Sequence, residues 1–319
     1  MTRLENHLAF VFPGQGSQSV GMLADLAERF SIVRETFAEA GEALGFDLWD
    51  LTANGPEAAL NQTQNTQPAM LAAGVAVWRV LQSLSPARPG WMAGHSLGEY
   101  TALVCAEALA FSDAVKLVAE RGRLMQEAVP AGAGAMAAIL GLEEHVVVNA
   151  CADAAQGQVV TAANFNAPGQ IVIAGEAAAV ERAIEALKAA GAKRALMLPV
   201  SVPSHCALMG PAADELYELL RSVRINTPSL TLIHNADVKS HASPDMIRLA
   251  LKDQLFKPVR WVDSVKFMHD QGARVFVECG PGKVLQGLNK RIAPTATHLT
   301  VFDGDSLTSV LEQLEQIHG

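Results

Sequence analysis

The sequence predicts an α/β protein of two lobes, in which a large lobe holds a parallel sheet and a small lobe is inserted into it. Half of the residues are hydrophobic and only 5% are aromatic, as in proteins whose buried parallel strands are rich in small and branched apolar residues. The length of 319 residues exceeds the roughly 100–200 residues of one domain. Between residues 130 and 202 the order of predicted strands and helices changes, and this change predicts the second lobe.

The first part of the large lobe alternates short apolar runs with segments of helical periodicity. Residues 7–12 are predicted to form a strand that ends at Pro13-Gly14, because this dipeptide is typical of a loop. Pro68 is compatible with the first turn of a helix, where its missing N–H costs no hydrogen bond. The predicted elements are strands over 7–12 and 91–95, and helices over 22–44 (with a break), over 67–84, from 97 onward and over 112–128.

The middle of the chain predicts a small ferredoxin-like lobe. Its predicted elements are strands over 134–141, 159–166, 170–175 and 193–200, and helices over 143–155 and 176–190. Their order is β-α-β-β-α-β, which is the split-βαβ unit. We therefore assign residues 130–202 to this lobe, and residues 1–129 together with 203–319 to a discontinuous large lobe.

After the small lobe the chain returns to alternating strands and helices. Ser204 is expected to cap a helix over 205–221, because a serine hydroxyl can accept a hydrogen bond from a free N–H of the first helical turn. The other predicted elements are strands over 229–234 and 274–279, and helices over 244–256, 258–271 and 283–291.

Composition and charge exclude several classes of function. The net charge is −9 and no arginine-rich run occurs, which disfavours binding to nucleic acid. The four cysteines show no spacing typical of a metal site, so we expect buried thiols in a reducing compartment and no metal. The N-terminus has no signal-peptide pattern, and no apolar run reaches the roughly 18 residues of a membrane span. We expect a monomeric, cytoplasmic protein without membrane association.

Residues 94–98, Gly-His-Ser-Leu-Gly, fit the G-x-S-x-G pattern of a nucleophile elbow. The motif lies between a predicted strand and a predicted helix, the context it requires in an α/β-hydrolase-like lobe. Glycines permit a sharp turn there, and the N-terminus of the following helix favours negative charge beside the hydroxyl. The pattern therefore predicts Ser96 as a nucleophile, with a purely structural turn as the alternative.

A serine nucleophile needs an oxyanion hole and a base. The N–H groups of Leu97 and of Gln15 are candidate oxyanion donors, although the 14–16 loop around Gln15 could be a simple glycine-rich connection. His205 is the candidate base, because it lies where the chain leaves the small lobe and a lobe junction is a common place for a cleft. His234 is the alternative base, and an ordinary position at a helix terminus is the alternative for His205.

Seven motifs make the chain similar to the malonyl-CoA:acyl-carrier-protein transacylases of fatty-acid synthesis, nearly from end to end. They are FPGQGSQ at 12–18, GHSLGEY at 94–100, ERG at 120–122, NFNAPGQ at 164–170, PVSVPSH at 199–205, QLFKPVRW at 254–261 and GPGKVL at 280–285. One such motif is weak evidence, but seven in the same order are highly specific. The resemblance implies that a malonyl group passes from a coenzyme A thioester to acyl-carrier protein, with no metal or redox cofactor.

The resemblance also implies roles for the residues around the nucleophile. It makes Ser96 the residue that takes the acyl group, His205 the general base and then general acid, and Gln15 with Leu97 the oxyanion hole. The sequence shows no clear acidic third member. The backbone carbonyl of Gln254 would orient His205 instead, since the third group of such a site mainly fixes the imidazole.

Substrate contacts follow from the same resemblance. Arg121 would pair with the free carboxylate of malonate, and Met125 and Asn164 would line the pocket. A guanidinium fork does match a carboxylate, although a solvated helix arginine is the alternative for Arg121. The chain departs from the pattern at His234-Asn235, where a second small polar residue is expected before the asparagine.

An acidic carrier protein needs basic docking residues on this acidic chain. Two Lys-Arg pairs are candidates, Lys193-Arg194 in the small lobe and Lys290-Arg291 in the large lobe, with solvated surface charge as the alternative for each. Three other functions compete with transfer to a carrier of fatty-acid synthesis. They are a serine thioesterase or hydrolase of patatin type, a non-catalytic protein with an acyl-binding pocket, and an acyltransferase that serves a polyketide synthase.

Overall fold

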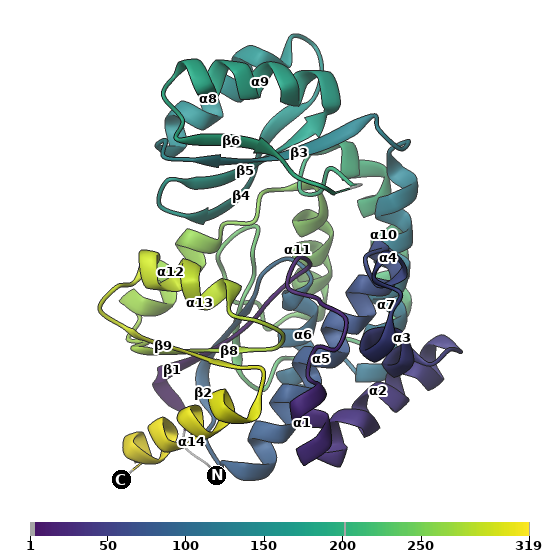
Figure 1. The fold of residues 1–319 in the computed structure, drawn as a ribbon, viewed down its shortest axis with the longest axis vertical. Coiled ribbons are helices and arrows are strands. Elements are labelled where there is room, and N and C mark those ends of the chain that lie inside the picture. Colours follow the sequence, from purple (N-terminus) through teal and green to yellow (C-terminus); the bar gives the residue numbers. More distant parts are fainter. Residues whose placement is uncertain (1–3, 201, 319) are drawn as a thin grey trace.

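The chain folds into a large lobe around a parallel sheet and a small lobe around an antiparallel sheet, as expected (Figure 1). The computed structural model describes residues 4–200 and 202–318. Ser201, inside the motif at 199–205, therefore lies outside the described residues. The expected lobe limits, 1–129 with 203–319 and 130–202, stay a prediction.

The large sheet has five parallel strands in the order β7-β2-β1-β8-β9. They are β1 (Glu5–Phe12), β2 (Pro89–Gly94), β7 (Thr231–Ile233), β8 (Val275–Cys279) and β9 (Thr297–Val301). Phe12 is paired with Gly94, so β1 and β2 end side by side. The loops that follow them meet at the carboxyl edge of the sheet, which is where α/β folds place their sites.

Both faces of the large sheet are covered, which explains its near-continuous apolar strands. Alternate residues of β1 enter different cores: Leu8, Phe10 and Phe12 pack with residues of the long helices, whereas Ala9 and Val11 pack with residues of α12 and α13. The helices on the first face include α2 (Ser31–Leu44), α5 (Thr63–Leu84), α6 (Gly98–Cys105), α7 (Phe111–Ala128), α10 (Gly210–Ser222) and α11 (Pro244–Phe256). The other helices are α1 (Ala24–Arg29), α3 (Leu48–Asn54), α4 (Glu57–Leu60), α12 (Trp261–Asp270), α13 (Val284–Ile292) and α14 (Gly304–His318).

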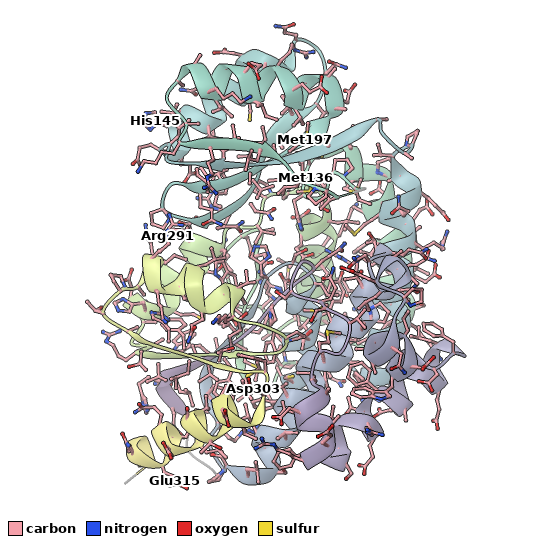
Figure 2. The ribbon with its side chains drawn as sticks, viewed as in Figure 1. Met136, His145, Met197, Arg291, Asp303 and Glu315 are labelled. Atoms are coloured by element: carbon pink, nitrogen blue, oxygen red, sulfur yellow. The ribbon has the colours of Figure 1, made fainter. Side chains whose placement is uncertain are left out.

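The small lobe is the expected β-α-β-β-α-β unit. Its elements are β3 (Gly134–Leu140), α8 (Glu144–Ala155), β4 (Val160–Ala167), β5 (Gln170–Glu176), α9 (Ala177–Ala189) and β6 (Arg194–Met197). The strand order is β4-β5-β3-β6, and all its pairings are antiparallel. Ile139 and Ile173 face α8 and α9, while Met136 and Val172 belong to a separate cluster on the opposite face, together with Cys206. Figure 2 shows Met136 on the side of the small sheet that faces the large lobe.

A short β-bridge joins the two lobes. Val259, between α11 and α12, pairs in parallel with Asn164 of β4. The bridge consists of two backbone hydrogen bonds, from the Phe165 N–H to the Val259 carbonyl and from the Val259 N–H to the Ala163 carbonyl, both 2.9 Å. Arg291 of α13 adds a second link, because its guanidinium donates to the Pro168 carbonyl and the Gln170 side chain of the β4–β5 hairpin.

Several predicted boundaries are wrong. Ser204 caps no helix: a 3₁₀ turn over Ala207–Met209 precedes α10, which begins at Gly210, because His205 has φ +61° and cannot enter a right-handed helix. Helix α5 begins four residues before the predicted start, so Pro68 lies inside it rather than in its first turn. The predicted break in the first helical segment is confirmed, since Phe30 separates α1 from α2 in extended conformation.

Candidate active site

Ser96 lies on a tight turn between β2 and α6. Its φ is +50°, a left-handed value that is rare for a residue with a side chain. The two glycines of the motif allow this turn to pack closely. A Cβ on Gly94 would lie 1.8 Å from the Gly98 carbonyl carbon, and one on Gly98 would lie 2.1 Å from the Phe12 carbonyl oxygen. The sharp turn leaves the Ser96 hydroxyl at the carboxyl edge of the sheet, as in a nucleophile elbow.

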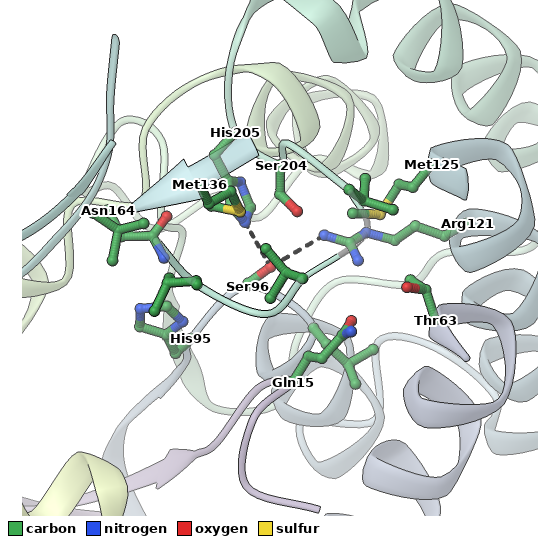
Figure 3. Close-up of a pocket in the computed structure, with 15 residues that line it drawn as sticks. Gln15, Thr63, His95, Ser96, Arg121, Met125, Met136, Asn164, Ser204 and His205 are labelled. Carbon is green, nitrogen blue, oxygen red and sulfur yellow. Dashed lines mark hydrogen bonds between the residues drawn. The ribbon is translucent and has the colours of Figure 1, made fainter. Parts of the chain in front are cut away.

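The Ser96 hydroxyl is linked to His205, and His205 to the backbone of Gln254. Ser96 Oγ lies 2.8 Å from His205 Nε2 (Figure 3). His205 Nδ1 lies 2.7 Å from the Gln254 carbonyl oxygen. A carbonyl can only accept, so Nδ1 carries the proton and Nε2 is free to accept one from the hydroxyl. Of the two candidate bases, the structure therefore brings His205 to the serine.

The surroundings of His205 keep it neutral. Burial lowers the pKa of the imidazole most, the nearby charge of Arg121 lowers it further, and the pKa falls to about 3 despite the opposing hydrogen bond to the Gln254 carbonyl. The ring is only 2% exposed. At neutral pH His205 is thus unprotonated and can act as a proton acceptor.

Arg121 points from α7 toward Ser96 and is fully buried, at 1% exposure. Its guanidinium donates to Gln67 Oε1 (2.8 Å), Gln254 Oε1 (2.9 Å) and Ser96 Oγ (3.2 Å), as Figure 3 shows for the last of these. Its Nε has no hydrogen-bond partner within the described residues. Burial lowers the pKa of Arg121, while Tyr100 and Glu99 nearby raise it. The arrangement is a buried cation with no carboxylate among its hydrogen-bond partners in the described residues.

The two predicted oxyanion donors lie beside Ser96. Gln15 follows β1 and Leu97 follows the serine directly, and both line the same cavity. Within the described ranges neither backbone N–H is used in a hydrogen bond of the protein. Two free amides near a nucleophile can stabilise negative charge on a carbonyl oxygen.

The cavity above Ser96 has a volume of about 150 Å³ and lies between the lobes. Met125 comes from the large lobe, and Asn164 comes from the small lobe with its side-chain oxygen buried and unpaired among the described residues. The large lobe forms the floor and the open face of the small sheet forms the roof. The cavity is lined by Gln15, Thr63, His95, Ser96, Leu97, Arg121, Met125, Met136, Asn164, Val172, Leu198, Val200, Val202, Ser204 and His205.

Sequence reasoning missed a buried polar network behind the serine. Asn235 accepts from the Ser96 N–H and donates to the Gly94 carbonyl, both at 2.7 Å. Glu99 accepts from the Asn235 N–H, from Gln254 Nε2 and from His234 Nδ1. His234, the alternative base, therefore faces Glu99 and not Ser96. Glu99 stood inside the GHSLGEY motif, but no local pattern links it to Asn235.

His95 packs on Trp261, with ring centres 5.6 Å apart, and its Nε2 is bonded to Asn166. It also forms part of the cavity wall. All four cysteines are free and buried, as expected. Over residues 4–200 and 202–318, no cluster of three or more His, Cys, Asp or Glu side chains could hold a metal. No helix in those ranges is both long and apolar enough to cross a membrane.

The four basic residues expected to dock a carrier protein do not line the cavity. Lys193, Arg194 and Lys290 are exposed. Arg194 pairs with Leu140, four residues along β3 from cavity-lining Met136, or roughly 13 Å at the usual strand rise. Arg291 is exposed at the junction of the lobes (Figure 2) and uses its guanidinium in the link to the β4–β5 hairpin.

An α/β fold with a serine on a strand-to-helix elbow and a histidine at hydrogen-bond distance defines the broad class of serine hydrolases and acyltransferases. Within that class, the chain belongs to the acyl transferase domain family, whose model matches residues 9–297. The match spans both lobes and contains every site residue described above.

Curated relatives and solved structures agree with this assignment. The malonyl CoA-acyl carrier protein transacylase of Escherichia coli K12 is 58% identical over 304 residues, which are 95% of this chain and 98% of the relative. That of Bacillus subtilis 168 is 42% identical over 310 residues, 97% and 98% of the two chains.

Two solved structures are nearly superimposable. The acyl carrier protein S-malonyltransferase of Vibrio cholerae has a TM-score of 0.94 and 58% identity, and the match covers 95% of this chain and 99% of that one. A malonyl-transacylase solved in complex with its type II polyketide-synthase acyl-carrier protein has a TM-score of 0.95 and 56% identity, with 96% and 99% covered.

Proposed function

We propose that this protein transfers a malonyl group from malonyl-CoA to the phosphopantetheine thiol of an acyl-carrier protein, and so supplies malonyl-carrier protein for fatty-acid synthesis. The observation that carries the proposal is Arg121, a fully buried cation beside the Ser96 hydroxyl that has no carboxylate among its hydrogen-bond partners. A buried charge is costly unless it is paired, and a guanidinium fits a carboxylate. The names of the relatives support the same reaction.

The proposed chemistry is acyl transfer in two half-reactions. His205 Nε2 takes the proton as Ser96 Oγ forms a bond to the thioester carbonyl carbon, and the tetrahedral intermediate then breaks its C–S bond. The coenzyme A thiolate leaves with the proton from His205. The carrier thiol gives its proton to His205, attacks the malonyl-serine ester and releases Ser96, which regains the proton. The 2.8 Å contact between Ser96 and His205 supports these proton transfers.

The amides of Gln15 and Leu97 would stabilise the oxyanion of each intermediate. Both line the cavity and neither has a partner within the described protein, which suits groups whose acceptor arrives with the substrate. Removal of one such donor typically costs on the order of 100-fold or more in rate. Because the Leu97 donor is a main-chain group, changing the Leu97 side chain leaves it in place.

The pocket residues would select the acyl group. The free carboxylate of malonyl would lie against Arg121, whose Nε–H has no partner among the described residues. Asn164 brings an unpaired buried oxygen to the same cavity, and Met125 supplies an apolar wall and accepts from Gln67 Nε2. An acetyl group has no carboxylate and would leave the Arg121 charge uncompensated.

The carrier protein is proposed to dock on the basic pairs Lys193-Arg194 and Lys290-Arg291. All four side chains are exposed, and Arg291 sits at the junction of the lobes, where its guanidinium bonds to the β4–β5 hairpin. Reversing both pairs to Glu should raise the KM for carrier protein, most strongly at low salt. The control is Lys188→Glu on α9, the helix layer behind the small sheet. An unchanged KM would dismiss the docking role.

The mechanism calls for no metal and no redox cofactor, since side chains and backbone amides supply every proton transfer and charge contact. We further propose that the enzyme acts as a monomer in the cytoplasm, where coenzyme A thioesters and carrier proteins are available. One solved neighbour is in complex with a polyketide-synthase carrier protein, so carriers of both fatty-acid and polyketide synthesis are candidate acceptors.

The test is intact-protein mass spectrometry after brief mixing with malonyl-CoA. The expected result is a malonyl adduct on the wild type and none on Ser96→Ala or His205→Ala, followed by discharge when phosphopantetheinylated carrier protein is added. Carriers of fatty-acid and polyketide synthesis are compared as acceptors. Release of free malonate without carrier would identify a hydrolase, and the absence of any adduct or turnover would identify a binding protein.

A further inference from the structure

The backbone ladder between β7 and β2 ends before it reaches the nucleophile. Its last pair is Ile233 with Ala93. Beyond that pair the chain of β7 turns away, since the His234 N–H donates to the Lys239 carbonyl. The Gly94 carbonyl and the Ser96 N–H on this edge of β2 therefore receive no backbone partner from β7.

The side chain of Asn235 takes the place of the missing backbone. Its Oδ1 accepts from the Ser96 N–H and its Nδ2 donates to the Gly94 carbonyl, each at 2.7 Å. In a parallel ladder, the N–H of one residue donates to a carbonyl on the neighbouring strand. The carbonyl of the same residue accepts from the N–H that lies two residues further along that strand. The carboxamide of Asn235 reproduces that pattern across His95, whose own N–H donates to Phe12 on the other side.

Asn235 is itself held rigidly. It is completely buried, as are His234 and Glu99. Glu99 Oε2 accepts from the Asn235 N–H at 3.0 Å, Glu99 Oε1 accepts from His234 Nδ1 at 2.6 Å, and the Asn235 carbonyl accepts from the Arg260 N–H at 3.1 Å. The carboxamide of Asn235 cannot flip its oxygen and nitrogen, because the Gly94 carbonyl can only accept and the Ser96 N–H can only donate.

We infer that Asn235 is a positioning residue that holds the left-handed Ser96 turn by bonding both Gly94 and the Ser96 amide. The inference rests on the proposed function, in which Ser96 is the nucleophile. Leu97 follows Ser96 directly, so rotation of the Ser96 peptide would also move the Leu97 N–H away from the oxyanion. Asn235 touches no substrate. Its loss should therefore slow acylation of Ser96 without weakening the binding of malonyl-CoA.

The sharpest test is Asn235→Asp, which keeps the shape but makes the side chain an acceptor only while it is ionised. A carboxylate can still accept from the Ser96 N–H but repels the Gly94 carbonyl, whereas a protonated carboxyl can donate to it. Burial away from water and the neighbouring Glu99 carboxylate both favour the protonated form. Acylation by malonyl-CoA should be on the order of 100-fold slower than wild type at pH 8, and it should recover as the pH is lowered toward 5.5.

The measurements are single-turnover acylation by rapid quench and mass spectrometry, and binding of malonyl-CoA in a Ser96→Ala background. Binding should change by less than about twofold. Asn54→Asp, at the exposed last residue of α3, is the control for an added charge. Asn235→Ser removes both bonds without a charge and should be slow at every pH, so it replaces Asn235→Asp if that variant unfolds. Thermal unfolding identifies the folded variants.

Either of two results would overturn the inference. The first is a folded variant at 235 that acylates at the wild-type rate at pH 8. The second is equal loss of binding and rate with no recovery at lower pH, which would indicate general damage to the cleft. Failure of the proposed function is recognised separately, because the wild type itself would then form no malonyl adduct or Ser96→Ala would still form one.

Discussion

Replacing Arg121 with alanine tests the chemical basis of substrate choice. The guanidinium is buried and has three uncharged hydrogen-bond partners, Gln67, Gln254 and Ser96. Loss of one partner of a buried charged contact costs roughly 2–5 kcal/mol. Since about 1.4 kcal/mol is a factor of ten in rate, malonyl loading should fall roughly 30-fold to several thousandfold. Acetyl loading should stay constant or rise, because a cation without a counterion is removed.

The assay is the rate of adduct formation from malonyl-CoA and from acetyl-CoA, measured on the same preparation. Arg123→Ala is the matched control, since Arg123 lies on the same helix but its side chain is partly exposed and paired with Glu120 and Glu127. It should leave both rates unchanged. Equal losses for the two donors in Arg121→Ala would refute the carboxylate role.

The pH profile of Arg121→Ala gives an independent check. Arg121 is the second cause of the low pKa of His205, after burial. Its removal should raise the pKa of His205 from about 3 but leave it below the ordinary histidine value of 6.5, because the ring stays buried. As the pH is lowered, His205 of the variant should therefore become protonated at a higher pH. The rate of acetyl loading should fall at a higher pH in the variant than in the wild type.

Three other outcomes follow from the structure. Gly98→Ala should destabilise or prevent folding, because its Cβ would lie 2.1 Å from the Phe12 carbonyl oxygen, whereas Gly210→Ala has open space and should leave the melting temperature nearly unchanged. The pKa of His205 is lowered to about 3 in the folded state, so the unfolded state binds the proton first and stability must fall as pH drops below 6.5. In urea unfolding, the titration of His205 should lower the free energy of unfolding by roughly 2 kcal/mol between pH 6.5 and 5. The His205→Gln variant should not show this contribution. Asn164→Leu should keep or raise the melting temperature, because it removes a buried unpaired oxygen, but it should raise the KM for malonyl-CoA.

The sequence predicted those parts of the fold that depend on local pattern. The spacing of Gly94 and Gly98 around Ser96 predicts the elbow because only glycine fits both crowded positions. The order of strands and helices over 130–202 predicts the small lobe because each element shows its own periodicity. By contrast, β9 and α14 were not predicted, nor were the short helices α3 and α4.

Parts of the site depend on contacts between distant segments, and these had no local signal. Residues alone left His205 and His234 as alternative bases, and the resemblance to a family was needed to choose. Asn235 is 139 residues from Ser96 in the chain, so nothing near either residue indicates their hydrogen bond. Ser204 was expected to cap a helix because serine is common at that position, but the left-handed backbone of His205 delays the helix.

The β-bridge between Asn164 and Val259 ties mechanics to chemistry. Asn164 lines the cavity, and Val259 lies five positions after Gln254, whose carbonyl orients His205. The strand that carries this bridge, β4, also lies against α12 and α13 of the large lobe (Figure 1). To part the lobes here, the protein would have to break two backbone hydrogen bonds and disturb the setting of the base. The spacing of the cavity walls at this point is therefore coupled to the position of the proposed base, His205.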